Sequence, residues 1–428
     1  MNLFRPICAI AAALAIAALA GCQTAPQAPK PAPPPPTAAE QPPGPPATHP
    51  MLSEEPGFLR LPNQPSGTNP VRVGLLLPYS NGSSQTRYLA TAMMKAAQLA
   101  LFDAGNPNIT LISADEGSTP DSAANGARSL LAQGAEVIVG PLFAASVSAV
   151  APIAHDRAVP VIAFSTDVKK AGNGVYLLSF QPENEVRRTV SYAVETGHKH
   201  FAALVSPGAY GDHIAEALKA DTAAMGADVV AVERLDPLTQ ADALHRIAAS
   251  NADVLIVAAG GNALRGLAPA LAENGIDRSK IKLMGTGLWD DPSIQKEAAL
   301  EGGWFAAPSP EADSSFVAKY KAAYGSEPPQ LASLAYDAVS LVALLSHGTP
   351  YHRFTDSALT DPNGFAGVEG ILRFDPDGTS ERGLAILAVE PDGFRVVDPA
   401  PRTFEKPATP PPEKTTSSLT PRSPQSGG

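Results

Sequence analysis

Residues 134–142 read GAEVIVGPL, a short apolar run with a glycine before it and a Gly-Pro pair after it. Residues 159–166 read VPVIAFST and repeat this pattern, with polar residues directly after the apolar run. Runs rich in valine and isoleucine between turn residues indicate buried strands. A helical pattern over 146–155 separates the two runs. A strand, a helix and a second strand predict a parallel pair joined by a crossover helix.

The same alternation extends in both directions from this unit. In the first half, we predict strands over 71–77, 109–113, 136–139 and 159–164, with helices over 88–103, 121–133 (capped by Asp121) and 146–155. In the second half, we predict strands over 201–206, 229–232, 254–258 and 281–284, with helices over 213–225, 240–249 and 263–274. Two such runs predict an α/β protein of two lobes, each a parallel sheet flanked by helices.

Composition excludes several classes of protein. The chain has 428 residues and a formal net charge of −11, with no basic block. Nucleic-acid binding is not expected, because phosphate contacts need clustered lysine and arginine. Hydrophobic residues make up 44% of the chain, which is enough for packed cores. Two cysteines exclude a scaffold held together by disulfides.

The N-terminus predicts export and lipidation. Arg5 precedes an apolar run over 7–20, which is too short to span a bilayer as a helix and reads as a secretory signal. The run ends in LAGC at Cys22, which resembles the bacterial lipobox and implies a signal peptide over 1–21 and a diacylated Cys22. An ordinary signal peptide with a chance cysteine is the alternative. Gln23 resembles the outer-membrane sorting class, so we expect the periplasmic face of the outer membrane.

Proline marks two segments outside the folded part. Residues 22–70 include four consecutive prolines and predict an extended, disordered linker. Residues 400–428 are rich in proline, serine and threonine and predict a disordered tail. The folded part is therefore expected over 71–399.

Three loops carry a resemblance to a known family. The segments 134–142 and 159–166, together with AYG at 209–211, resemble the type 1 periplasmic binding fold of the Leu/Ile/Val-binding class. The resemblance implies three crossovers between lobes, which we place near Phe180, Ala306 and Phe365. Lobe 1 would then comprise about 71–180 and 307–365, and lobe 2 about 181–306 and 366–399.

Four further segments resemble a narrower group, the penicillin-binding protein activators. They read GTGLWDDP at 285–292, GWFAAP at 303–308, LASLAYDA at 331–338 and DPNGFAG at 361–367. The resemblance implies an outer-membrane lipoprotein that stimulates a bifunctional penicillin-binding protein, that is, a peptidoglycan synthase. Enteric members carry a helical-repeat domain where this chain has a proline-rich linker, so partner contacts through such a domain are not implied.

The ligand of such a fold lies beyond the carboxyl ends of the strands. The candidate cleft residues are Tyr79, Ser80, Ser146, Ser165, Thr166, Tyr210, Asn262 and Asp290. Several have a structural alternative: Ser146 as a helix cap, and the two tyrosines as packing residues. Asp291 before Pro292 reads as a helix cap. The amino-acid receptors place an acid where this chain reads 285–287, GTG, which weakens an amino-acid assignment.

No enzyme motif is complete. Ser-x-x-Lys occurs at 279–282 and 293–296, but no Lys-[Ser/Thr]-Gly follows either. His198 and His200 have no partner at metal-ligand spacing. Glu183, Glu185 and Glu195 lie near arginines and read as a solvated helix surface. We therefore expect no catalytic residue, metal or cofactor.

Three functions remain open. The leading hypothesis is a non-enzymatic, lipid-anchored activator of a peptidoglycan synthase. The alternative is the solute-binding receptor of an ABC importer for branched-chain amino acids or a related small ligand. A sensor that binds a ligand and reports to a partner is the third.

Overall fold

A computed structural model describes residues 58–61, 70–350 and 352–404. The expected signal peptide, Cys22, nearly all of the expected linker and most of the expected tail lie outside these residues. Within the described ranges, no helix is both long enough and apolar enough to cross a membrane.

The first lobe is built on a six-stranded sheet with the order β1-β3-β2-β4-β5-β6. The strands are β1 (Phe58–Arg60), β2 (Val71–Leu77), β3 (Ile109–Asp115), β4 (Val137–Val139), β5 (Val161–Ala163) and β6 (Val175–Leu177). All neighbours run parallel except β1, which pairs antiparallel with β3 at the edge. The parallel core agrees with the predicted fold, and the antiparallel edge strand was not predicted.

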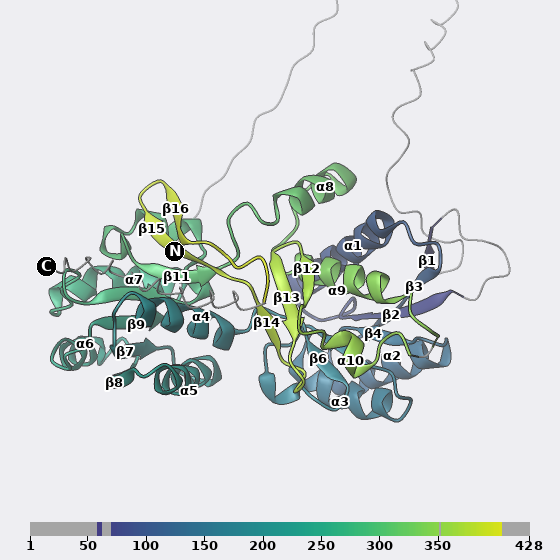
Figure 1. The fold of residues 1–428 in the computed structure, drawn as a ribbon, viewed down its shortest axis with the longest axis horizontal. Coiled ribbons are helices and arrows are strands. Elements are labelled where there is room, and N and C mark those ends of the chain that lie inside the picture. The colour runs from purple at the N-terminus through teal and green to yellow at the C-terminus, as the bar shows by residue number, and fades with distance from the viewer. Residues whose placement is uncertain (1–57, 62–69, 351, 405–428) are drawn as a thin grey trace, which may run out of the picture. The chain divides into compact units, whose positions relative to one another are not determined.

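Helices cover both faces of this sheet, because its strands are apolar on both sides. Leu75 and Leu77 of β2 belong to the core formed with α1 (Ser84–Ala104) and α9 (Ala332–Leu345). Leu76 points to the other face and joins the core formed with α2 (Pro120–Ala132) and α3 (Ala144–His155). This alternation follows from the twofold repeat of side chains along a strand. Figure 1 shows α1 and α9 beside each other.

The second lobe has a seven-stranded sheet with the order β16-β15-β11-β10-β9-β7-β8. The strands are β7 (His200–Val205), β8 (Asp228–Arg234), β9 (Val254–Ala258), β10 (Lys282–Gly285), β11 (Trp304–Ala307), β15 (Ala385–Glu390) and β16 (Gly393–Asp398). Helices α4 (Pro182–Glu195) and α5 (Ala209–Ala224) cover one face, and α6 (Gln240–Ala248) and α7 (Gly261–Glu273) the other. β15 and β16 are antiparallel additions that were not predicted, so the parallel sheet expected in this lobe is extended to a mixed one.

A third, small antiparallel sheet contains β12 (Phe365–Gly367), β13 (Gly370–Phe374) and β14 (Ser380–Arg382). Phe365, Leu372 and Phe374 join the first-lobe core that also contains α8 (Ser314–Tyr324), and α10 (Asp356–Leu359) adds Leu359 to it. The chain therefore returns to the second lobe after Arg382, and not near Phe365 as predicted. The other two crossovers follow Leu177, close to the predicted Phe180, and Ala307, one residue beyond the predicted Ala306.

Several helix starts also differ from the prediction. α1 begins at Ser84 because the Ser83 side chain accepts a hydrogen bond from the Thr86 N–H. α2 is capped by Thr119 and not by Asp121. Ser146 lies inside the first turn of α3 and does not cap it. Asp291 does cap a short 3-10 helix, Pro292–Lys296, as predicted from the Asp-Pro pair.

The C-terminal segment remains ordered beyond the predicted boundary at 399. Ala400 packs against the second-lobe core. Phe404 lies 4.5 Å from the Arg373 guanidinium, measured to the ring centroid, and a Cβ on Gly364 would approach its ring to 2.8 Å. The segment from 399 to 404 therefore contacts both lobes.

Candidate functional site

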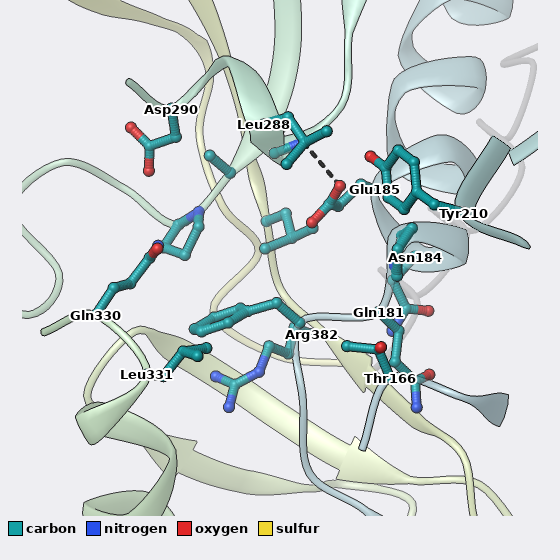
Figure 2. A pocket seen from close by; sticks show the side chains of 16 residues that line it. Thr166, Gln181, Asn184, Glu185, Tyr210, Leu288, Asp290, Gln330, Leu331 and Arg382 are labelled. Atoms are coloured by element: carbon teal, nitrogen blue, oxygen red, sulfur yellow. Dashed lines mark hydrogen bonds between the residues drawn. The ribbon is translucent and has the colours of Figure 1, made fainter. Parts of the chain in front are cut away.

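A pocket of about 270 Å³ is lined by residues from both lobes and from the crossovers. It lies beyond the carboxyl ends of the parallel strands, where α/β sheets bind their ligands. Thr166 follows β5, Tyr210 opens α5 after β7, and Asp290 follows β10. Figure 2 shows these side chains with the crossover residues Gln181 and Arg382.

One end of the pocket carries two carboxylates. Glu185, in the first turn of α4, accepts a hydrogen bond of 2.7 Å from the backbone N–H of Gly287. Burial raises the pKa of Glu185 to about 7, and the negative charges of Glu183 and Asp290 act in the same direction. Burial also raises the pKa of Asp290. Two partly desolvated acids in the lining of one pocket favour a bound cation.

Tyr210 lies beside Glu185 in this pocket. Its hydroxyl lies 2.8 Å from the Thr286 hydroxyl, and burial raises its pKa. The remaining wall is mostly apolar and includes Phe180, Leu288, Leu331 and Leu384. An apolar pocket with a few placed polar groups is typical of sites for small molecules.

The opposite end of the pocket contains Arg382 of β14. Its side chain is 2% exposed, and its guanidinium lies 3.5 Å from the carboxylate of Asp337, whose side chain is 1% exposed. The guanidinium carbon also lies 4.9 Å from the centroid of the Phe180 ring. Phe180 belongs to the first crossover and Arg382 ends the strand before the third, so these contacts connect the pocket to the interlobe connections.

Comparisons with known proteins agree with this geometry. A sequence model described as a periplasmic binding protein matches residues 70–393. The chain belongs to the periplasmic binding protein family. A search of curated proteins found no match.

Solved structures show the same fold for this periplasmic binding protein. A branched-chain amino acid ABC transporter ligand-binding protein from Burkholderia xenovorans has a TM-score of 0.61 at 20% identity, covering 76% of this chain and 94% of its own. A leucine-binding protein from Thermotoga maritima has a TM-score of 0.54 at 19% identity, covering 77% of this chain and 98% of its own. A solute-binding protein from Rhodopseudomonas palustris, solved in complex with 3,4-dihydroxybenzoic acid, has a TM-score of 0.55 at 23% identity. The match covers 78% of this chain and 97% of its own. The matched family is one of binding proteins, which agrees with the expectation that the chain is not an enzyme.

The structure brings three of the eight predicted cleft residues, Thr166, Tyr210 and Asp290, to this pocket. The other five lie outside it and have partners of their own. The Ser80 hydroxyl donates a hydrogen bond to Asp115, and the Tyr79 hydroxyl donates one to the Met94 sulfur. Ser146 is buried against Glu116. The Ser165 hydroxyl accepts a hydrogen bond from the Asp167 N–H, and the Asn262 side chain accepts one from Arg265. In this structure, these side chains contact neighbouring loops and helices and not the pocket.

Sequence reasoning missed Gln181, Glu185 and Arg382. The acidic start of α4 was predicted to be a solvated helix surface, which is wrong for Glu185 because its carboxylate faces the pocket and bonds Gly287. The available signal was the position of this acidic cluster directly after the first crossover. Among the described residues, no group of three or more histidine, cysteine, aspartate or glutamate side chains could hold a metal.

Three of the four segments that resemble the activators contribute to the lining of this pocket. The first supplies Gly287, Leu288 and Asp290, the second Ala307 and Pro308, and the third Leu331. The fourth ends at Gly367, where a Cβ would approach the Asp337 carboxylate to 2.6 Å. Three segments therefore form part of the pocket wall, and the fourth contacts Asp337, the ion-pair partner of Arg382.

Stability is expected to fall as pH rises, in part through Glu369. This residue is 3% exposed, and burial raises its pKa to about 7 although Arg382 and Ser333 oppose the shift. The folded state then binds more protons than the unfolded state between about pH 4.5 and 7, so stability is lost as pH rises through this window. Urea unfolding at pH 5 and pH 8 should show a smaller fall for Glu369→Gln than for the wild type. An equal fall in both proteins would contradict this assignment.

Proposed function

We propose that this protein is the solute-binding receptor of an ABC importer and takes a small ligand with a cationic group and an apolar body. The observation that carries this proposal is the pair of carboxylates, Glu185 and Asp290, in an otherwise mostly apolar pocket. The family and the solved solute-binding structures support the receptor class.

The charge balance of the pocket favours a cation at this end. In the described part of the chain, neither Glu185 nor Asp290 forms an ion pair with lysine or arginine. The Glu185 carboxylate has one backbone N–H donor, and Arg382 is paired with Asp337. An ammonium group would offset the desolvation of both carboxylates.

The apolar wall restricts the chemistry and the size of the rest of the ligand. Phe180, Leu288 and Leu331 offer contact to an aliphatic or aromatic body, and about 270 Å³ suits a molecule of the size of an amino acid. Branched-chain amino acids and related amines fit this description. The acid that amino-acid receptors place near 285–287 has a substitute here in Glu185, which reaches the same loop from α4.

A thermal-shift screen tests this proposal. The panel contains L-leucine, L-isoleucine, L-valine, 3-methylbutylamine and benzoate, each at up to millimolar concentration. A ligand at a hundred times its Kd should stabilise the protein by about 2.7 kcal/mol. We expect stabilisation by the ammonium compounds and none by benzoate. Stabilisation by benzoate alone, or by none of the five, would contradict the proposal.

Lipidation of Cys22 is the basis of the proposed location at the periplasmic face of the outer membrane. The four residues LAGC place this cysteine directly after the apolar signal, and two acyl chains give stable anchoring. Cys22→Ser is expected to abolish incorporation of labelled palmitate in cells, whereas Cys8→Ser, inside the signal, should leave it unchanged. Equal incorporation in the two variants would rule out the anchor. Membrane fractionation of the wild type separates the outer from the inner membrane.

Activation of a bifunctional penicillin-binding protein is a second candidate function. It is favoured by the four activator-like segments, three of which contribute to the wall of this pocket. Affinity capture with the mature protein from detergent-solubilised envelopes, followed by mass spectrometry, should recover such a synthase if this function holds. Recovery of the membrane subunits of an importer instead would contradict the activator function and support the solute-binding receptor function.

A further inference from the structure

We propose that residues 400–404 form a strap that fastens the second lobe to the first and biases the angle between the lobes, with Phe404 as its releasable anchor. The strap follows β16 in the second lobe and ends on β13, which packs on the first lobe (Figure 1). It is a fourth connection between the lobes, in addition to the three crossovers. Its role is independent of which ligand the pocket takes.

The second-lobe end of the strap is held by an ion pair and by packing. Asp398, the last residue of β16, pairs with the Arg188 guanidinium of α4. The Arg188 Nε also donates to the Leu384 carbonyl at 2.9 Å, just after the third crossover. Ala400 then packs against the second-lobe core. The start of the strap therefore moves with the second lobe.

The middle of the strap passes beside two crossovers. A Cβ at Gly383, in the third crossover, would lie 3.1 Å from the Pro401 carbonyl oxygen and 3.2 Å from its ring. The missing side chain of Gly383 therefore leaves room for Pro401. Arg402 lines a cavity of about 370 Å³ together with Ser309 and Ala312, which follow the second crossover.

The first-lobe end of the strap is the Phe404 ring. Its centroid lies 4.5 Å from the guanidinium carbon of Arg373. Glu381, the cross-strand neighbour on β14, holds this guanidinium through a 2.9 Å hydrogen bond from Nε. Gly364 leaves space for the ring, since a Cβ there would approach it to 2.8 Å. A partly exposed cation–π contact is weak, so Phe404 can detach without unfolding either lobe.

The short length of the strap couples the Phe404 contact to the interlobe angle. Four residue steps separate Ala400 from Phe404 and span at most about 14 Å, and Pro401 has a fixed φ. A change in the angle displaces one anchor relative to the other, and a segment this short has little slack to absorb the displacement. Because the contact favours the angle seen here, its release shifts the population of interlobe angles.

Interlobe distances in the ligand-free protein test the strap. The chain expressed from residue 22 with Cys22→Ser contains no other cysteine. Ser129→Cys on α2 and Glu273→Cys on α7 then supply one exposed spin-label site in each lobe. Double electron–electron resonance gives the distribution of distances between the two labels.

Variants of the anchor should change this distribution. In Phe404→Ala, the fraction of the minor interlobe distance should rise about two- to fivefold, the size expected for loss of one partly exposed cation–π contact. Phe404→Tyr keeps the ring and should match the wild type. Phe143→Ala removes a phenylalanine of the first lobe that is 39% exposed and lies outside the strap, and it should also match the wild type.

A double-variant cycle assigns the partner of the ring. Arg373→Met should give the same shift as Phe404→Ala, and the two together should give no further shift, because both remove one contact. Circular dichroism and urea unfolding establish that each variant is folded.

An unchanged distance distribution in Phe404→Ala would overturn the strap, and so would an equal shift in Phe143→Ala. Additive shifts from Phe404→Ala and Arg373→Met would overturn Arg373 as the partner of the anchor. All these distances are measured without ligand, so a negative ligand screen would overturn the proposed function and leave the strap standing.

Discussion

Asp337→Ala is expected to lower the free energy of unfolding by about 3–5 kcal/mol, because it leaves a buried guanidinium without its ion-pair partner. The side chains of Asp337 and Arg382 are 1% and 2% exposed. The substitution also removes the acceptor of the Val368 N–H. Urea unfolding monitored by circular dichroism measures the change.

Two further variants control this prediction. Asp392→Ala, at an exposed position, should change stability by less than about 0.5 kcal/mol. The double variant Asp337→Leu with Arg382→Met removes both charges and should recover much of the loss, since replacing a buried pair by apolar residues is often neutral. A loss below about 1 kcal/mol for Asp337→Ala would show that Arg382 does not depend on this carboxylate.

Trp289→Ala should be comparably damaging, with a loss of about 3–5 kcal/mol from the cavity it creates. The side chain of Trp289 is fully buried, and its indole N–H donates to the Val257 carbonyl at 3.2 Å. The chain makes room for it with two glycines: a Cβ would approach the indole to 2.1 Å at Gly285 and to 2.7 Å at Gly303. The indole supports the loop that carries Leu288 and Asp290 into the pocket.

The other tryptophan provides the matched control. Trp304 is partly exposed, and its ring contacts the Lys282 ammonium at 3.7 Å. Trp304→Ala should lose clearly less stability than Trp289→Ala. Each variant retains one tryptophan, so fluorescence reports unfolding in both. Equal losses would contradict the assigned role of Trp289.

The α/β architecture could be predicted because its strands are continuous apolar runs separated by helical patterns. β4 and β5 lie within the runs that opened the sequence analysis. Strands β12 to β16 were not predicted, because they are joined by short turns and carry no helix between them to mark the alternation. Because these strands were not predicted, the third crossover was placed near Phe365, whereas the structure has it after Arg382.

The pocket was predictable only where it is formed by loops after strands. Thr166, Tyr210 and Asp290 follow strand ends, so topology places them. Gln181 and Glu185 follow a crossover, and Arg382 lies on an unpredicted strand. Their roles depend on contacts between residues about 100 to 200 positions apart, such as Glu185 with Gly287 and Asn184 with Ser380, which no local pattern encodes.

The functional expectation also changed in emphasis. The activator-like segments favoured a peptidoglycan synthase partner, whereas the family and the solved structures favour the solute-binding alternative. Three of these segments contribute to the wall of a ligand-sized pocket.

The most direct measurement is a calorimetric titration of 3-methylbutylamine into the wild type, Glu185→Gln and Glu195→Gln at pH 8. At this pH Glu185, whose pKa is about 7, is mostly ionised. We predict binding to the wild type, a loss of about thirtyfold or more in Glu185→Gln, in line with removal of a charged partner in a desolvated site, and no change in Glu195→Gln. Equal affinity in all three proteins, or no binding to any of them, would contradict the assignment of this pocket to a cationic solute.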